Sequence, residues 1–335
     1  MNTKDASISI IGDGGWGTTM AIHLANKKRS VVLWGAFAKY IEHMRQTREN
    51  EKFLPGFILP KNITLESNIE VAIDQSPTIV LAMPSKFFRS VLEQVKPFPT
   101  KTKTFVILTK GIENKTLMTM SQVLEDVLGK RTYTILSGPC ISREVVQQTP
   151  TAVAVAGSTA KARTFTRELF NAPHFTVLES DDSIGVQLGG SLKNVIAIVA
   201  GMLDGLGYGS NTKSVLLSRG IAEIARLGRK MKAKQHTFLG LSGLGDLVTT
   251  SFSIHSRNHS CGVRLGKGDS LEKILKETDM VIEGAETAKS ALALSKKFKI
   301  QMPIVKAVND VLFKKKAPKS IIDALMHKGF INEKE

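Results

Sequence analysis

The sequence contains few cysteines, few aromatic residues and no long hydrophobic run. Its only cysteines, Cys140 and Cys261, lie far apart and form no CxxC pair, so neither a disulfide framework nor a cysteine-rich zinc site is expected. The longest apolar stretch near the middle, residues 195–203, is far shorter than the roughly 20 residues of a membrane span. Residues 1–5 are polar and lead directly into an apolar segment, without the sections of a signal peptide. These absences predict a cytoplasmic protein with no membrane span.

Acidic residues are also scarce relative to basic ones, 30 against 46, which leaves a formal net charge of +16. Such a charge favours anionic partners, which include nucleic acid, anionic membrane surfaces and phosphorylated small molecules. Only 6% of the residues are aromatic, and the densest basic cluster is the short run at residues 314–316. Because no basic run is interleaved with Phe or Tyr, nucleic-acid binding is not expected.

The chain is long enough, at 335 residues, for about two domains. In its first half, short β-branched apolar runs alternate with amphipathic stretches, which predicts strands at 8–11, 31–34, 78–83, 104–109, 132–136, 151–156 and 175–178. After residue 180 the spacing of apolar residues predicts helices at 184–203, 212–230, 283–298, 303–313 and 320–328. The expected fold is an α/β domain with a doubly wound parallel sheet, residues 1–183, followed by an all-α domain, residues 184–335.

A glycine-rich motif follows the first predicted strand. Residues 12–17 read Gly-Asp-Gly-Gly-Trp-Gly, and a predicted helix at 18–28 and the strand at 31–34 come next. In this context Gly12 allows a tight turn, Gly14 lets the backbone approach a pyrophosphate, and Gly17 lets helix and strand pack closely. The helix N-terminus then favours the negative charge. The motif predicts a Rossmann-type domain that binds NAD(H) or NADP(H).

One part of this fingerprint is missing. An acidic residue about 20 positions further on would bind the adenosine ribose, yet there is none between Val31 and Ile41. The absence removes repulsion against a 2′-phosphate, and Lys39 could supply positive charge, which favours NADP(H). Lys39 is equally consistent with an ordinary surface lysine.

The chain resembles the bacterial NAD(P)-dependent glycerol-3-phosphate dehydrogenases essentially from end to end. The resemblance rests on ten short motifs in the family's order, at residues 12–17, 31–35, 84–85, 109–111, 137–139, 185–190, 193–197, 243–247, 256–258 and 283–284. It implies a helical substrate domain and interconversion of dihydroxyacetone phosphate and sn-glycerol 3-phosphate. It also implies a supply of precursor for glycerophospholipid synthesis, and a homodimer.

The resemblance implies roles for individual residues as well. Lys193 is the proton-transfer residue. The phosphorylated substrate would contact Lys110, Gly138, Cys140, Lys193, Asp246, Ser256, Arg257 and Asn258. Besides the three glycines of the motif, the cofactor would contact Gly15, Trp16, Lys110, Ser142, Arg257, Val281 and Glu283.

Two positions depart from the family pattern. Cys140 stands where relatives have Ser or Thr, which puts a side-chain hydrogen bond to the substrate in doubt. Ala36 stands where relatives often carry Arg or His, which weakens the expected contact to a 2′-phosphate. The choice between NAD(H) and NADP(H) is therefore left open by the sequence.

The chemistry of ketone reduction agrees with these roles. Hydride transfer places negative charge on the carbonyl oxygen, and the Lys193 ammonium can polarise that oxygen and then protonate it. Asp246 can orient Lys193 or bind a substrate hydroxyl, but as an anion it keeps the lysine charged, so reduction is expected to be preferred near neutral pH. Residues 256–258 offer a hydroxyl, a guanidinium and an amide, a suitable phosphate grip if they open a helix.

Three other interpretations fit parts of this sequence. His255 and His259 lie four residues apart and, with Asp246, suggest a metal, but two polar histidines beside a phosphate site are the simpler account, and no metal is predicted. A 6-phosphogluconate-type or 3-hydroxyisobutyrate-type dehydrogenase has a similar two-domain build but lacks the Ser-Arg-Asn grip. A catalytically idle NADP-binding sensor would keep the glycine motif without turnover.

Overall fold

A computed structural model of the chain describes residues 7–74, 76–278 and 281–328. The chain forms two compact units. The first contains residues 1–109 and 120–183, and the second contains residues 110–119 and 184–335. Residues 110–119 thus belong to the second unit although strands of the first unit precede and follow them in the sequence.

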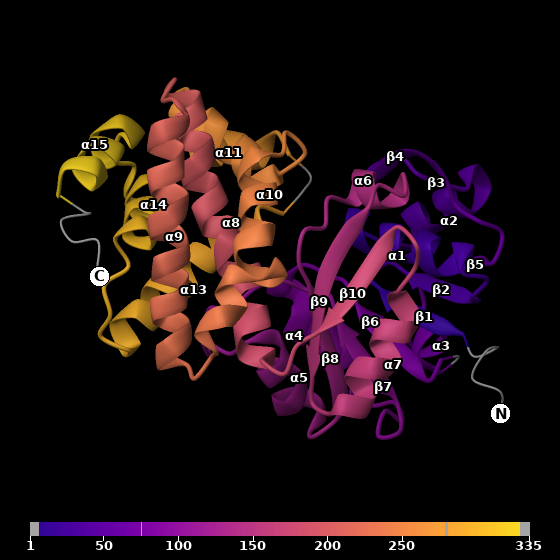
Figure 1. Cartoon of the computed structure of the whole chain (residues 1–335). Coiled ribbons are helices and arrows are strands. Elements are labelled where there is room, and N and C mark those ends of the chain that lie inside the picture. The colour runs from indigo at the N-terminus through magenta and orange to yellow at the C-terminus, as the bar shows by residue number, and fades with distance from the viewer. Residues whose placement is uncertain (1–6, 75, 279–280, 329–335) are drawn as a thin grey trace. The chain divides into compact units, whose positions relative to one another are not determined.

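One sheet organises the first unit (Figure 1), with its described strands in the order β10-β9-β8-β7-β6-β1-β2-β5. All seven predicted strands are confirmed. The sequence pattern misses β5 and a separate hairpin of β3 and β4, where Pro55 and Gly56 signal a turn rather than a strand. The strands are β1 (Ile8–Ile11), β2 (Val31–Trp34), β3 (Glu49–Asn50), β4 (Leu54–Ile58), β5 (Ile63–Glu66), β6 (Thr78–Leu81), β7 (Thr104–Ile107), β8 (Thr132–Ser137), β9 (Thr151–Gly157) and β10 (Phe175–Glu179).

The predicted parallel arrangement holds for six strands and fails at β9. Strands β5, β2, β1, β6, β7 and β8 pair in parallel, whereas β9 runs antiparallel to β8. Only the short helix α6 (Ser142–Val146) lies between β8 and β9, and it packs on α1 (Gly15–Asn26). A parallel return needs a crossover to the opposite edge of the sheet. Because α6 stays near the edge where β8 ends, the chain re-enters the sheet from that edge.

Helices cover both faces of this sheet (Figure 1). The chain runs from β1 outward to β2 and β5, then returns to β6 on the other side of β1, so right-handed crossovers place the two sets of helices on opposite faces. The carboxyl ends of β1 and β6 therefore form the switch point where such sheets bind ligands. The remaining helices of this unit are α2 (Ala38–Thr47), α3 (Ile69–Asp74), α4 (Ser85–Val95), α5 (Met120–Leu128) and α7 (Ala160–Phe170).

The second unit is helical, and no strand follows β10 in the described part of the chain. Its apolar core is built around α8 (Ser183–Gly205), whose residues from Gly185 to Leu203 are all buried. By length and composition α8 could cross a membrane, but the apolar window that meets this test is 100% buried within the structure, as in a core helix. The other helices are α9 (Ser210–Lys230), α10 (Asp246–Phe252), α11 (Arg257–Gly266), α12 (Leu271–Lys276), α13 (Glu283–Lys297), α14 (Pro303–Lys314) and α15 (Pro318–Lys328), with single turns η1 (Gln235–Leu239) and η2 (Leu241–Gly245).

Helices α8 and α11 cross with their backbones in direct contact. A Cβ atom at Gly201 would lie 2.0 Å from the carbonyl oxygen of His259, and one at Gly262 would lie 1.9 Å from that of Ile198. Glycines recur one turn later in both helices, at Gly205 and Gly266, with the same close approach. No larger residue fits at this crossing without moving one helix away from the other.

Candidate functional site

Residues 12–17, here called the glycine loop, form the tight turn after β1 and the first residues of α1. Gly12 has a φ of 121°, and its N–H donates to the Trp34 carbonyl of β2 at 3.0 Å. A Cβ at Gly17 would lie 2.0 Å from the carbonyl oxygen of Gly12, so glycine is needed for helix and strand to meet here. A Cβ at Gly14 would meet no atom within 4 Å, which leaves open space beside the backbone.

The glycine loop leads into α1 at the switch point of the sheet. Gly14 is the N-cap of α1 and has no side chain to satisfy the first N–H groups of the helix. Those N–H groups and the positive end of the helix dipole favour an anion. The open space at Gly14 and the uncapped helix together fit the pyrophosphate of a dinucleotide.

Two predicted cofactor residues, Trp16 and Ser142, lie at this loop. The Ser142 hydroxyl oxygen is 3.7 Å from the position of a Cβ on Gly15, and Thr19 donates to the Ser142 carbonyl at 3.4 Å. The indole nitrogen of Trp16 is buried without a hydrogen-bond partner in the described structure. The structure thus brings Ser142 to the loop from a distant part of the sequence of the first unit.

A second group of polar side chains lies within the second unit, and we call Lys110, Lys193, Asp246 and Thr250 the lysine cluster. The Lys193 ammonium donates to one oxygen of Asp246 at 2.8 Å and to the Thr250 hydroxyl at 2.5 Å. The Lys110 ammonium donates to the other Asp246 oxygen at 2.6 Å. The Asp246 side chain is only 1% exposed, while Lys193 is 7% and Lys110 11% exposed.

The lysine cluster holds charged groups away from water. Two ammonium groups share one carboxylate, and charges held away from water interact more strongly than charges on the surface. Ammonium groups held in this way stabilise an anionic substrate, or an oxygen that becomes negative during a reaction. The cluster therefore suits the stabilisation of an oxyanion and the donation of a proton to it.

Local backbone geometry brings Asp246 to Lys193. The segment before Asp246 forms the single π-helical turn η2, a feature that is frequent at functional sites. A Cβ at Gly243 would lie 2.2 Å from the Phe238 carbonyl, and one at Gly189 of α8 would lie 2.4 Å from the Ser242 carbonyl. These glycines let the turn lie directly on α8, so that Asp246 enters the first turn of α10 beside Lys193.

Lys110 is held by a different contact. The N–H of Gly111 donates to the Ser191 hydroxyl of α8 at 2.8 Å, and Ser191 in turn donates to the Gln187 carbonyl at 2.7 Å. This contact fixes the segment that follows β7 to α8. Lys110 and Lys193 consequently approach Asp246 from two separate parts of the sequence.

The predicted phosphate grip does open a helix, α11, but its three side chains differ in what they do. The Ser256 hydroxyl is the N-cap of α11 and accepts from the His259 N–H at 3.2 Å. The Asn258 amide donates to Asn194 at 2.9 Å, and its oxygen accepts from the Gly284 N–H at 2.9 Å. Arg257 is exposed at the first helical position and lines a cavity of about 270 Å³.

The chain is similar to known proteins over nearly its whole length. A family model described as NAD-dependent glycerol-3-phosphate dehydrogenase N-terminus matches residues 7–163, and the one described as its C-terminus matches residues 182–323. The glycerol-3-phosphate dehydrogenase [NAD(P)+] of Agathobacter rectalis is 43% identical over 319 residues, which cover 95% of each chain. This chain belongs to the NAD-dependent glycerol-3-phosphate dehydrogenase family.

Other members of the glycerol-3-phosphate dehydrogenase family are similar to this chain over nearly its whole length. The relative from Geobacillus kaustophilus is 43% identical over 326 residues, which cover 96% of this chain and 95% of that protein. The crystal structure of the Coxiella burnetii glycerol-3-phosphate dehydrogenase aligns with a TM-score of 0.94 at 32% identity, over 97% of this chain and 99% of that one. The resemblance inferred from motifs is therefore confirmed over the whole chain.

The remaining predicted site residues lie as follows. Gly138 and Cys140 follow β8 in the first unit, and Gly138 has a φ of 154° with no room for a side chain beside Val153. Val281 and Glu283 lie at the start of α13 in the second unit. The contacts predicted for these four residues with ligands stay predictions.

The two histidines considered for a metal do not gather around Asp246 in the structure. His259 instead pairs with Asp204 at 2.7 Å, and Lys213 donates to the same carboxylate oxygen at 2.6 Å. Both neighbours hold the pKa of Asp204 below its ordinary value, although burial opposes them. Among the described residues, no three His, Cys, Asp or Glu side chains come together as a metal site would require.

Sequence reasoning missed three residues that hold predicted site residues in place. Thr250 lies four residues after Asp246, and this spacing on a helix places both side chains on one face. Ser191 and Asn194 flank Lys193 on α8, within or beside motifs that the resemblance had already marked. The helical spacing around Asp246 and Lys193 was the available signal for Thr250.

Proposed function

We propose that this protein is an NAD(P)-dependent glycerol-3-phosphate dehydrogenase that interconverts dihydroxyacetone phosphate and sn-glycerol 3-phosphate. The observation that carries this proposal is the buried lysine cluster, in which Lys193 and Lys110 share Asp246. The names of the relatives, which cover nearly the whole chain, support the same reaction. The product of reduction would supply glycerophospholipid synthesis.

In the reduction, the bound nicotinamide cofactor supplies a hydride to the central carbon of the ketone. The Lys193 ammonium donates a proton to the oxygen that becomes negative, which gives the secondary alcohol and leaves Lys193 as a neutral amine. Asp246 and Thr250 hold the Lys193 nitrogen in place through their hydrogen bonds of 2.8 and 2.5 Å. Asp246 also favours the charged form of Lys193, which is the form that reduction requires.

The oxidation needs the opposite state of Lys193. The neutral amine would have to accept the proton of the substrate hydroxyl, and the adjacent Asp246 carboxylate disfavours that neutral form. Lys110 opposes Asp246 only in part, because it shares the carboxylate with Lys193. We therefore expect reduction to be the preferred direction near neutral pH.

We assign the substrate phosphate to the N-terminal turn of α11. The Arg257 guanidinium is exposed there, and the helix N-terminus adds its own attraction for an anion. Ser256 and Asn258 already hold chain atoms, so they act mainly by fixing this turn. The remaining substrate contacts in the proposal are Lys110, Gly138, Cys140, Lys193 and Asp246.

We assign the dinucleotide to the glycine loop. The pyrophosphate would lie on the first N–H groups of α1 beside Gly14, where a Cβ would meet only open space. Within the first unit the proposed cofactor contacts are Gly12, Gly14, Gly15, Trp16, Gly17 and Ser142, and within the second they are Lys110, Arg257, Val281 and Glu283.

We also propose that the enzyme works in the cytoplasm as a homodimer, without a metal, a nucleic-acid partner or a membrane span. The burial of the apolar helix α8 supports the last point. Sedimentation at micromolar concentration tests the dimer, and a chelator that leaves turnover unchanged tests the absence of a metal.

A steady-state assay tests the proposed function directly. Purified protein should oxidise NADH or NADPH when dihydroxyacetone phosphate is added, and a Lys193→Met variant should lose at least about 10²–10⁴-fold in kcat. Circular dichroism and dinucleotide binding should be unchanged in the variant, which separates loss of chemistry from loss of fold. If the wild type binds a dinucleotide but never turns over, an idle sensor is the better interpretation.

A further inference from the structure

A buried carboxylate oxygen without a hydrogen-bond partner lies in the glycine loop. Asp13 stands between Gly12 and Gly14, and its Oδ2 atom is buried and makes no hydrogen bond in the described structure. A Cβ on Gly35 would lie 2.4 Å from this oxygen, so the carboxylate lies directly against the residue that follows β2. An unsatisfied carboxylate oxygen in such a place is costly and calls for an explanation.

The backbone of Asp13 is held firmly in this position. The Asn50 amide donates to the Asp13 carbonyl at 2.7 Å, and the Thr18 hydroxyl donates to it at 3.2 Å. Asn50 is itself completely buried at the start of the β3–β4 hairpin. The placement of the carboxylate is thus determined by two elements besides the glycine loop.

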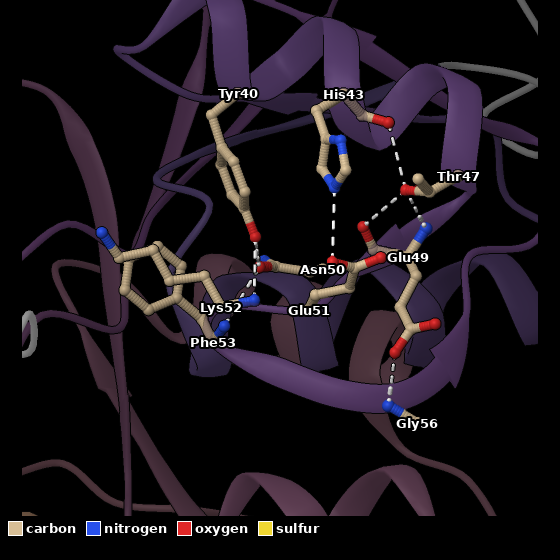
Figure 2. Close-up of polar contacts among 9 residues, drawn as sticks. All are labelled: Tyr40, His43, Thr47, Glu49, Asn50, Glu51, Lys52, Phe53 and Gly56. Atoms are coloured by element: carbon tan, nitrogen blue, oxygen red, sulfur yellow. Dashed lines mark hydrogen bonds and ion pairs between the residues drawn. The ribbon is translucent and has the colours of Figure 1, made fainter.

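Figure 2 shows how Asn50 is fixed in turn. Tyr40, which points down from α2, donates from its hydroxyl to the Asn50 side-chain oxygen at 2.8 Å. The backbone N–H of Phe53 donates to the same oxygen at 3.2 Å, and the N–H of Lys52 donates to the Tyr40 hydroxyl at 3.0 Å. The Phe53 carbonyl also lies 2.8 Å from the position of a Cβ on Gly15, so the segment between β3 and β4 packs directly against the glycine loop.

The negative charge of Asp13 is compensated only in part by its surroundings. Burial raises the pKa of Asp13, and a backbone hydrogen bond and the charge of Lys52 lower it only in part. The charge of Asp13 also acts on Tyr40, because the pKa of Tyr40 is raised by burial and further by Asp13. The two side chains after Gly35 give no counter-charge, because Ala36 and Phe37 are uncharged and exposed.

We infer that Asp13 accepts hydrogen bonds from the adenosine ribose hydroxyls of the dinucleotide and thereby selects NAD(H) over NADP(H). The inference rests on the proposed function. In Rossmann-type domains an acidic residue near the end of the second strand binds these hydroxyls, and this chain has Gly35 and Ala36 there instead. Asp13 brings a carboxylate to the same place from the first strand's loop. The 2′-phosphate of NADP(H) would be repelled by this like charge. The absence of an acidic residue after β2 therefore no longer favours NADP(H), and the expected preference is for NAD(H).

Direct binding measurements test this inference without any turnover. Titration of wild-type protein with NADH and with NADPH, followed by quenching of the fluorescence of Trp16 and Trp34, should give a Kd at least about tenfold lower for NADH, because opposed like charges are strongly unfavourable. In Asp13→Asn, which keeps the shape and removes the charge, the ratio of the two Kd values should fall by about tenfold or more. Most of this change should come from tighter NADPH binding.

Two further variants sharpen the result. Glu42→Gln removes an exposed carboxylate from neighbouring α2 and should leave the ratio unchanged. Lys39→Ala should also leave it unchanged, whereas a selective loss of NADPH affinity would assign the 2′ position to Lys39 and overturn the inference. Asp13→Ser provides a second substitution if Asp13→Asn is unstable, with circular dichroism as the check of folding.

The outcomes separate this inference from the proposed function. Wild-type protein that binds NADPH as tightly as NADH contradicts the role of Asp13, even if dihydroxyacetone phosphate is reduced. A strong NADH preference that disappears in Asp13→Asn supports the role, even if no turnover is found. Wild-type protein that binds neither dinucleotide overturns both.

Discussion

The glycine loop of the first unit and the lysine cluster of the second unit offer positive charge to their ligands in different ways. The loop presents backbone N–H groups at the start of α1 and needs small residues so that nothing stands between them and a phosphate. The cluster presents two ammonium groups that are held by one buried carboxylate. Backbone groups keep their charge at every pH, whereas ammonium groups can release a proton. The comparison explains why binding is assigned to the first site and proton transfer to the second.

The largest effect is expected on stability, from a methyl group added at Gly17 of the glycine loop. Gly17→Ala would place its Cβ 2.0 Å from the Gly12 carbonyl, so the first unit must distort and the free energy of unfolding should fall by more than about 4 kcal/mol. Gly14→Ala meets only open space, and its unfolding free energy should stay within about 0.5 kcal/mol of the wild type. Urea unfolding followed by tryptophan fluorescence measures both values.

The same pair of variants tests what the open space is for. Because the Gly14→Ala methyl would stand where the pyrophosphate is proposed to lie, the Kd for NADH should rise at least about tenfold although stability is unchanged. Wild-type affinity in Gly14→Ala would show that the dinucleotide does not approach the backbone at this point.

A smaller but still large effect is expected in the lysine cluster. Asp246→Asn leaves two buried ammonium groups without their carboxylate, and breaking a buried ion pair typically costs about 3–5 kcal/mol. Since the charged form of Lys193 is also disfavoured, kcat/KM for reduction should fall by about 10²–10³-fold. Steady-state kinetics with dihydroxyacetone phosphate measures the loss.

Thr250→Val is the matched variant, because it removes the hydrogen bond from the Lys193 ammonium to an uncharged hydroxyl and keeps the carboxylate. A loss of about 10- to 100-fold is expected, since a hydrogen bond to a charged group contributes about 1.5–3 kcal/mol. If Thr250→Val were as damaging as Asp246→Asn, the charge of Asp246 would not be the reason for its importance.

Much of the fold could be predicted from the sequence because its signals are local. The strands are short apolar runs, and the glycine loop is six consecutive residues, so neighbouring residues are enough to recognise both. The reversed direction of β9 depends on where α6 packs, and the β3–β4 hairpin contains Pro55 and Gly56, so tertiary contacts decided both. The carboxylate of Asp13 could be recognised as part of the motif, but its position against Gly35 could not, because that contact joins the segments after two different strands.

The site residues could likewise be predicted where a local motif marks them, and not where a tertiary contact places them. Lys193, Lys110 and Asp246 were inferred from family motifs, and the structure brings these three side chains together. Thr250 was missed because a single threonine on a helix has no distinctive pattern. Ser256 and Asn258 were predicted as ligands, and only the structure reveals that they hold the N-terminal turn of α11 and the start of α13.

The smallest effects are expected from buried titratable groups outside both sites. These groups make the stability of the two units depend on pH in opposite directions. In the first unit, burial lowers the pKa of His23 to about 4, and its Nε2–H donates to the Phe170 carbonyl at 2.7 Å. The stability contributed by neutral His23 is therefore present above pH 6.5 and lost as the pH falls toward 4. In the second unit, burial raises the pKa of Glu223 to about 8, while the N–H groups of Ile304 and Val305 bind its oxygens and oppose the shift.

For Glu223 the dependence of stability on pH is reversed. The stability contributed by its protonated form is present below pH 4.5 and is lost as the pH rises toward 8. Hydrogen exchange should thus reveal weaker protection of α1 in acid and of α14 in mild alkali, each by on the order of 1–3 kcal/mol. His23→Asn and Glu223→Gln should each abolish the pH dependence in their own unit only. Loss of protection of α14 in acid instead would contradict the assignment to Glu223.

The glycine crossing of α8 and α11 has a consequence for redesign of this enzyme. Lys193 and Arg257 lie on helices whose separation is set by main-chain atoms in contact at Gly201 and Gly262, and not by interdigitated side chains. Enlarging or shrinking the aliphatic residues elsewhere around α8 alters the filling of the interior but leaves that spacing unchanged. A heat-resistant variant can accordingly be sought by repacking the interior of the helical half, with Lys193 and Arg257 kept at their natural separation.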